Sequence, residues 1–181
     1  LESTALAMVA EGKGIIAIDE SNNTIKKRFE SVKIENTEEN RRAYRELLLT
    51  TPKLGEHISG AILYDETLRQ STRDGRRFVD VMNAAGIIPG IKVDMGTVAM
   101  PGFPGELVTE GLDGLTRRLE EYYKLGARFA KWRAVITIGE NLPSSACIGA
   151  NMLALARYAA ACQAVGLVPM VEPEVLMDGD H

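Results

Sequence analysis

Five short apolar runs organise the sequence, and each carries charged residues at or near its end. They are rich in Val, Ile, Leu and Ala, as buried strands are, and they span residues 14–19, 60–65, 90–94, 129–135 and 168–172. Segments with helical periodicity lie between them. Alternation of helices with nearly continuous apolar strands predicts an α/β fold, with a parallel sheet covered by helices.

The intervening segments carry recognisable helix signals. Thr37 is placed to cap a helix that runs toward Pro52, and Gly126 suits the end of a helix whose apolar residues share one face. Residues 152–164 form a nearly charge-free helical pattern, so we expect that helix to be buried on more than one side.

The spacing of the strands favours a (β/α)8 TIM barrel of which about the first five βα units are present. The predicted strands recur about every 30–45 residues, close to or longer than the unit of such a barrel. A doubly wound open sheet is the alternative, but Gly12-Lys13-Gly14 precedes the first strand instead of following it, so we interpret it as a turn. Because a complete barrel takes at least about 200 residues, we expect residues 1–181 to form a partial barrel domain of a longer protein.

Composition excludes several partners. With 21 basic and 25 acidic residues, the formal charge is −4, which argues against binding to nucleic acid or to an anionic membrane surface. The longest uncharged stretch, residues 141–156, is too short to span a bilayer. Cys147 and Cys162 form no CxxC motif and fit a reducing, cytoplasmic compartment.

The most informative charges lie inside the predicted strands. Successive strand residues face opposite sides, so charges two positions apart share a side. Such pairs are Lys92 with Asp94, Lys131 with Arg133, and Glu172 with Glu174, while Asp19 ends the first run. Unpaired charges would be costly against the helix layer, so we expect them to face inward, near the C-terminal mouth where barrel enzymes place catalytic groups. Internal ion pairs without catalytic function are the alternative.

The mixture of charges constrains the chemistry. Acids and bases in one cavity suit proton transfer on a carbonyl compound, and a lysine beside other cations would have the lowered pKa that imine formation requires. The cations, together with the hydroxyls of Ser21 and Thr24, suit a phosphorylated substrate, although helix capping also explains these two hydroxyls.

A metal site is the main chemical alternative. Asp19, Asp94, Glu172 and Glu174 could offer oxygens to Mg²⁺, but the cations expected in the same cluster argue against it. His57 lies at the opposite end of the barrel from the mouth, which makes zinc less favourable still. We therefore expect no metal and no cofactor.

Seven segments in order carry a family resemblance. They are GKGIIAIDES (12–21), ENTEENRRAYRELLL (35–49), SGAILYDETL (59–68), PGIKVDMG (89–96), GLDGL (111–115), GARFAKWR (126–133) and VPMVEPE (168–174). On these segments the chain resembles class I fructose-bisphosphate aldolases over essentially its whole length. The resemblance implies a (β/α)8 barrel that cleaves fructose 1,6-bisphosphate to dihydroxyacetone phosphate and glyceraldehyde 3-phosphate through a lysine Schiff base. It also implies a homo-oligomer, expected to be a tetramer, in the cytoplasm or alternatively in a plastid.

The resemblance assigns roles by motif. Asp19 matches the aspartate that assists carbon–carbon cleavage, Lys131 the lysine that stabilises charge, and Glu172 the acid–base group that dehydrates the carbinolamine. Ser21, Thr24 and Lys92 fall where the family holds the 6-phosphate. Further phosphate contacts are implied for Arg133, Lys27 and Arg28, and supporting charges for Asp94 and Glu174.

One departure limits these expectations. The Schiff-base lysine of the family lies on the sixth strand, and neither Lys92 nor Lys131 matches its motif. We therefore expect residues 1–181 alone to be inactive or nearly so. The alternatives are a Mg-assisted barrel lyase, or a catalytically inactive aldolase fragment with a structural or interaction role.

Overall fold

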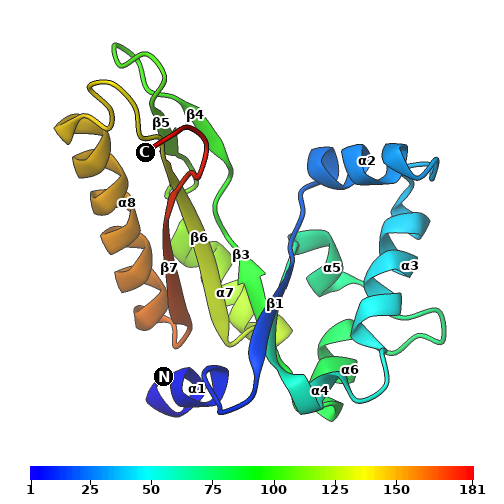
Figure 1. Cartoon of the computed structure of the whole chain (residues 1–181). Helices are drawn as coiled ribbons and strands as arrows, with labels where there is room; N and C mark the ends of the chain where they lie inside the picture. Colours follow the sequence, from blue (N-terminus) through cyan, green and yellow to red (C-terminus); the bar gives the residue numbers. More distant parts are fainter.

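The computed structural model describes all of residues 1–181. Its main sheet has five strands in the order β1-β2-β3-β6-β7, and every neighbouring pair is parallel. The strands are β1 (Gly14–Ile18), β2 (Ile58–Leu63), β3 (Ile88–Lys92), β6 (Phe129–Ile136) and β7 (Val168–Val175). Figure 1 shows the sheet curving as a half-barrel with helices around it. The predicted parallel sheet, with strands adjacent in chain order, is confirmed.

The strand bounds differ from the sequence prediction, by one residue in β1 and β6 and by more in β2, β3 and β7, which continues to Val175. β2 begins at Ile58 and ends at Leu63, so that Asp65 instead begins a short helix, α5 (Asp65–Arg69). β3 ends at Lys92, and Asp94 follows the strand. The apolar pattern continues into extended residues after the last paired position, and it therefore cannot mark where the ladder ends.

The remaining helices separate the strands. They are α1 (Glu2–Met8), α2 (Asn22–Ser31), α3 (Glu38–Leu49), α4 (Leu54–His57), α6 (Phe78–Ala84), α7 (Leu115–Leu125) and α8 (Ser145–Ala164). The Thr37 hydroxyl accepts a hydrogen bond from the Asn40 amide at 3.1 Å, which confirms the predicted cap of α3. Gly126 ends α7 with φ of 115°, a left-handed conformation that favours glycine. No helix is both long enough and apolar enough to cross a membrane.

Helix α8 corrects one expectation. It begins at Ser145, seven residues before the predicted segment, where the Ser144 hydroxyl accepts a hydrogen bond from the Cys147 amide. Its buried residues occupy a single face, whereas Ile148 and Leu153 are exposed. The prediction that this helix is buried on more than one side was wrong, because α8 packs against β6, β7, β5 and α7 with one face and leaves the residues of the other face exposed.

The principal core lies between the sheet and the helices. Trp132 on β6 packs against Tyr158 on α8, with ring centroids 5.6 Å apart, and both side chains are fully buried. The Tyr158 hydroxyl donates to the carbonyls of Ala130 at 2.6 Å and Met170 at 3.2 Å. One helical side chain thus ties together the two strands that carry Lys131 and Glu172.

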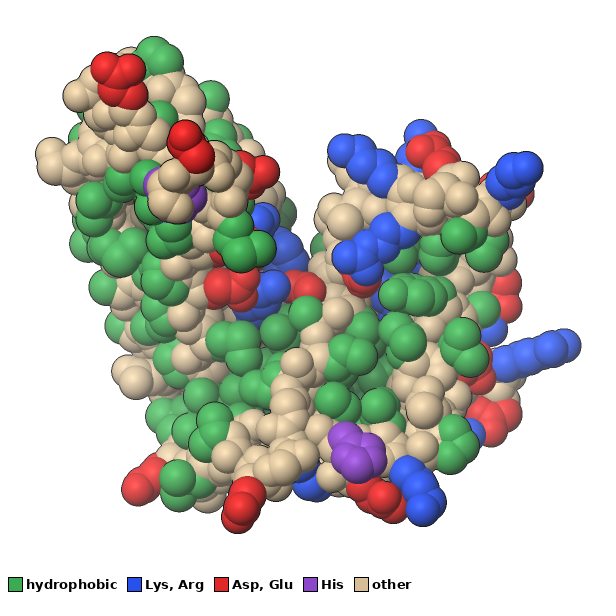
Figure 2. Space-filling view, in the orientation of Figure 1, with side chains coloured by type: hydrophobic (Ala, Val, Ile, Leu, Met, Phe, Trp, Pro, Cys, Tyr) green, Lys and Arg blue, Asp and Glu red, His purple; other side chains and the backbone are tan.

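A second apolar cluster closes the N-terminal end of the half-barrel. Met8 at the end of α1 packs with Ile62 and Phe129, whose side chains face the barrel interior. The Ser59 hydroxyl donates to the Met8 carbonyl at 2.6 Å and holds α1 in place. In Figure 2 this apolar surface lies below a hollow in which acidic and basic side chains gather. The charges therefore lie at the other end of the strands, as the sequence predicts.

A small antiparallel hairpin was not predicted from the sequence. It consists of β4 (Thr97–Ala99) and β5 (Leu107–Thr109), which are too short to give a pattern of alternating residues. The Thr109 hydroxyl donates to the Arg133 carbonyl at 2.8 Å, and the buried Asn151 side chain donates to the Leu107 carbonyl at 2.9 Å. The hairpin is thereby fixed against the C-terminal half of β6.

Candidate active site

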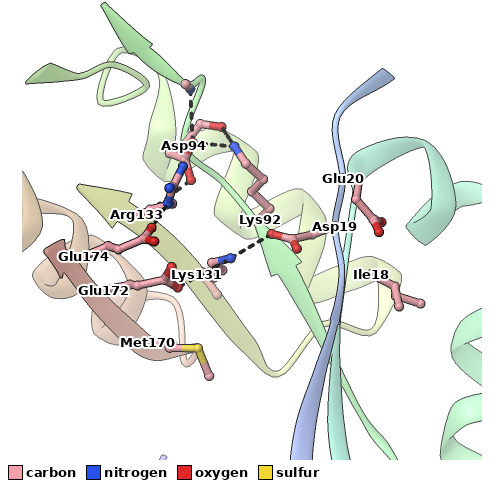
Figure 3. A network of polar contacts seen from close by, with 12 residues as sticks. Ile18, Asp19, Glu20, Lys92, Asp94, Lys131, Arg133, Met170, Glu172 and Glu174 are labelled. Atoms are coloured by element: carbon pink, nitrogen blue, oxygen red, sulfur yellow. Dashed lines mark hydrogen bonds and ion pairs between the residues drawn. The ribbon is translucent and has the colours of Figure 1, made fainter. Parts of the chain in front are cut away.

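Lys131 is the centre of the charged cluster. Its Nζ lies 3.2 Å from Asp19 Oδ2 and 3.4 Å from Glu172 Oε2 (Figure 3). The three residues come from β6, the end of β1 and β7, and 112 residues separate Asp19 from Lys131. The side chains of Lys131 and Asp19 are only 12% and 11% exposed. The three residues that the sequence assigns to catalysis are thus in direct contact.

The electrostatics of Lys131 correct the expectation of a lysine with a lowered pKa. Burial lowers the pKa of Lys131, but the negative charges of Asp19 and Glu172 and their hydrogen bonds outweigh burial, so the net pKa is raised. Lys131 therefore remains protonated near neutral pH. In this state it can stabilise negative charge or donate a proton, but it cannot act as an amine nucleophile.

A second group of charges lies beside this centre. Lys92 Nζ donates to the Asp94 carbonyl at 2.9 Å and pairs with the Asp94 carboxylate. The same carboxylate accepts from the Gly96 amide at 3.1 Å and the Arg133 amide at 3.4 Å. Asp94 thus joins the end of β3 to β6 and orients Lys92.

Arg133 and Glu174 form the outermost ion pair of the cluster (Figure 3). Their hydrogen bond raises the pKa of Arg133 and lowers that of Glu174, so both remain charged over the physiological range. Strand pairing positions these side chains, since Lys92 lies opposite Lys131 and Arg133 opposite Glu172. The inward orientation predicted from the spacing of two is confirmed.

The hydroxyls after β1 serve the cap of α2 and also line the cavity. Ser21 is the N-cap residue of α2 and accepts from the Thr24 amide at 3.4 Å, while the two hydroxyl oxygens are 3.1 Å apart. Arg28, further along α2, pairs with Glu20 at the cavity wall, whereas Lys27 is exposed. The structure thus brings Ser21 and Thr24 to the cavity and leaves Lys27 outside it.

The cavity at the mouth has a volume of about 850 Å³ and an open side. Seven of the residues singled out from the sequence line it: Asp19, Ser21, Thr24, Lys92, Asp94, Lys131 and Arg133. Arg69, Arg118 and Tyr122 from α5 and α7 form a further wall that the sequence analysis missed. Arg118 donates to the carbonyls of Val93 at 2.9 Å and Gly111 at 2.6 Å. The sequence did offer one signal for Arg118: it is a charged residue that lies close to the face of α7 carrying Leu115 and Leu119.

The four carboxylates of the cluster face three different cations and do not all converge on one point. Asp19 and Glu172 face Lys131, Asp94 faces Lys92, and Glu174 faces Arg133. No group of three or more His, Cys, Asp or Glu side chains is arranged to hold a metal ion. The geometry therefore offers no ligand set for the magnesium alternative.

Comparison with known proteins gives a consistent result. Residues 1–181 match the family described as fructose-bisphosphate aldolase class-I. The chain is 74% identical over 181 residues to the protein named "Probable fructose-bisphosphate aldolase class 1" of Xanthomonas axonopodis pv. citri, and 61% identical over 170 residues to the cytosolic fructose-bisphosphate aldolase 4 of Arabidopsis thaliana. A solved structure of fructose-bisphosphate aldolase from Plasmodium falciparum superposes with a TM-score of 0.97 at 53% identity.

These similarities cover nearly all of this chain but only part of each relative. The matches include 100%, 94% and 99% of this chain, against 54%, 43% and 52% of the Xanthomonas, Arabidopsis and Plasmodium proteins. The chain thus spans about half the length of the relatives it matches, and its five strands correspond to the N-terminal part of the aldolase TIM barrel. The chain belongs to the class I fructose-bisphosphate aldolase family.

Proposed function

We propose that residues 1–181 form the N-terminal, five-strand part of a class I fructose-bisphosphate aldolase, with strands six to eight outside this range. The reaction is the reversible cleavage of fructose 1,6-bisphosphate to dihydroxyacetone phosphate and glyceraldehyde 3-phosphate, as in glycolysis and gluconeogenesis. The observation that carries the proposal is the contact of Lys131 Nζ with the carboxylates of both Asp19 and Glu172, at 3.2 and 3.4 Å.

The contacts support a division of labour among these three groups. Lys131 is a fixed cation that can stabilise an oxyanion as the carbinolamine forms and as the carbon–carbon bond breaks. Glu172 is the most exposed of the three, at 33% of its side chain, so its carboxylate is accessible beside Lys131 and would exchange a proton with the carbinolamine hydroxyl. Asp19 assists carbon–carbon cleavage from the opposite side of Lys131.

Substrate phosphate would be bound by the cationic and hydroxyl groups at the mouth. Ser21 and Thr24 offer hydroxyls at the start of α2, where backbone amides also favour an anion. Lys92 and Arg133 line the same cavity, with Asp94 and Glu174 as supporting charges that orient them. Arg28 pairs with Glu20 at the cavity wall and could turn toward a bound phosphate, whereas Lys27 lies outside the cavity and is not included among these contacts.

The imine-forming lysine has no counterpart in this arrangement, because Lys131 is protonated and Lys92 is paired with Asp94. The proposal therefore places it outside residues 1–181 and predicts that these residues alone turn over little or no substrate. We further propose a homotetramer in the cytoplasm, on the basis of family membership and of the Arabidopsis relative named as cytosolic.

The deciding experiment compares this chain with a protein extended to the length of its relatives. Borohydride added with fructose 1,6-bisphosphate should trap a substrate adduct on a lysine of the extended protein, and turnover should persist in excess chelator. Loss of turnover in chelator would favour the magnesium lyase, whereas a folded extended protein without turnover would favour a structural role.

A single substitution tests the assigned chemistry in the extended protein. Glu172→Gln should lower kcat by about 10²-fold or more, as expected for loss of a general acid–base group, with a smaller effect on KM. Glu140→Gln, in the exposed loop after β6, is the matched control and should leave both constants unchanged. Equal kinetics for Glu172→Gln and the control would remove Glu172 from its role.

A further inference from the structure

Arg45 on α3 is the most buried charged side chain of the molecule, with the residue 1% exposed. A buried guanidinium is costly unless its donors are used, since an apolar side chain of similar volume would fill the same space without desolvating a charge. Arg45 does not line the cavity, and none of the catalytic or phosphate-binding roles above involves it. Its burial therefore calls for another explanation.

The hydrogen bonds of Arg45 converge on the end of β1. Its Nε donates to the Ile18 carbonyl at 3.2 Å, and its Nη2 donates to the Glu20 carbonyl at 3.1 Å. The same Nη2 lies 3.2 Å from the Glu20 carboxylate, which also pairs with Arg28. The planar guanidinium thus holds the two carbonyls that flank Asp19.

The position of this contact is significant because strand pairing ends there. β1 pairs with β2 as far as Ile18, opposite Leu63, and β1 lies at the edge of the five-stranded sheet. Asp19 and Glu20 have left the ladder, so strand pairing no longer fixes the direction of the chain. Figure 3 shows Asp19 pointing from this segment toward Lys131, while Glu20 points to the other side.

We propose that Arg45 is a positioning residue for Asp19: by holding the carbonyls of Ile18 and Glu20, it keeps the Asp19 carboxylate in contact with Lys131. This inference deepens the proposed function, because it concerns the group assigned to carbon–carbon cleavage. The competing explanation is that Arg45 merely ties α3 to the sheet through its ion pair with Glu20.

The test measures the ionisation of Lys131 and needs no turnover, so it can be evaluated even if the proposed activity fails. Trace acetylation with acetic anhydride across a pH series labels only neutral amines, and the pH profile gives an apparent pKa for each lysine. Lys131 faces the carboxylates of Asp19 and Glu172, and losing the first should lower its apparent pKa by about one unit. At a fixed pH below the apparent pKa of Lys131, a decrease of one pKa unit raises the acetylation of Lys131 about tenfold. Lys53, with a side chain 77% exposed, is the internal reference.

Three variants distinguish the explanations. Arg45→Lys keeps the positive charge beside Glu20 but lacks the planar fork, and Arg45→Met lacks both; we expect the apparent pKa of Lys131 to fall in each, and more in Arg45→Met. Arg42→Met, on the same helix but paired with Glu39 and Glu46, should leave the profile unchanged. If Arg45→Met does not fold, as judged by near-ultraviolet circular dichroism, Arg45→Lys decides alone. If Arg45→Lys folds and the pH profile of Lys131 acetylation is the same as in the parent protein, the proposal is overturned.

Discussion

Gly90 on β3 occupies a position where one added methyl group should destabilise the protein strongly. An alanine Cβ at this position would lie 2.1, 2.4 and 2.5 Å from the Cζ, Cε2 and Cε1 atoms of the Phe129 ring. The ring packs in the space that the missing side chain leaves, and Gly90 and Phe129 are directly paired across β3 and β6. Two residues further on, the same register places Lys92 opposite Lys131, so this contact bears on the site as well as on stability.

The magnitude follows from the distances. Nonbonded carbons approach to about 3.5 Å, so the ring or the strand must move by more than about 1 Å. Phe129 is completely buried, and Met8 and Ile62 pack with it, which leaves the ring no free space. Overpacking of this kind costs about 1–3 kcal/mol, and three contacts below 3 Å place Gly90→Ala at the upper end. The lower entropy of the unfolded chain offsets about 0.4–1 kcal/mol, leaving a net loss of about 2 kcal/mol.

The assay is urea unfolding, with Gly149→Ala as the matched control. Gly149 lies within α8 and has no atom within 4 Å of an added Cβ, so alanine there should stabilise the helix by about 0.5–1 kcal/mol. With an m value of about 2 kcal/mol/M, Gly90→Ala should lower the midpoint by about 1 M, whereas Gly149→Ala should raise it slightly.

A double-mutant cycle identifies the cause. In a Phe129→Leu background, Gly90→Ala should cost less than in the parent, with a coupling energy of about 1–2 kcal/mol. An unchanged midpoint for Gly90→Ala, or an equal loss in both backgrounds, would show that the Phe129 ring does not set the constraint.

Three further perturbations test other parts of the structure. Tyr158→Phe should destabilise the protein by about 1–2 kcal/mol in the same urea assay, because two strand carbonyls lose their buried donor; an unchanged midpoint would contradict this. The Ser144 hydroxyl and amide lower the pKa of Glu106, so this carboxylate stabilises the fold above the ordinary glutamate pKa and loses that effect as pH falls through its lower folded-state pKa. Glu106→Gln should therefore flatten the decline of the unfolding free energy as pH falls below the ordinary glutamate pKa, and a slope equal to that of the parent would refute the linkage. Burial raises the pKa of the Cys162 thiol to about 12 and also raises that of Cys147, so a disulfide reagent at pH 8 should label neither until the protein is denatured; rapid labelling of the native protein would contradict their burial.

The side of the barrel on which the charges lie could be predicted from the sequence, whereas their pairing could not. The spacing of two in Lys131 and Arg133, and in Glu172 and Glu174, sets their common orientation because side chains alternate along any strand. That rule contains no information about which carboxylate meets which cation. The contact of Lys131 with Asp19 depends on the curvature of the whole sheet, and its sequence separation of 112 residues lies beyond any local pattern.

Arg45 shows a different limit of sequence reasoning. In the segment 35–49 it is one of several charged residues on an amphipathic helix, and Arg41 and Arg42 beside it carry the same side chain. Helical spacing places Arg45 on the same face as Leu48 and Leu49, but it does not show which groups its guanidinium meets at the end of β1. Arg45 is buried because it donates to the carbonyls of Ile18 and Glu20, at the point where β1 leaves the sheet. These acceptors belong to the end of the strand, so the sequence of the helix does not reveal them.

The ionisation of Lys131 bears on whether residues 1–181 can contain the imine-forming lysine. A lysine that forms an imine must lose its proton near neutral pH, and the two carboxylates beside Lys131 oppose this by raising its pKa. One amine cannot be both the charged group and the neutral nucleophile, so an aldolase that uses this cluster needs a second lysine with fewer carboxylates beside it. Under the proposed function, the half-barrel would supply groups that stabilise charge and transfer protons, and the imine-forming lysine would come from outside residues 1–181.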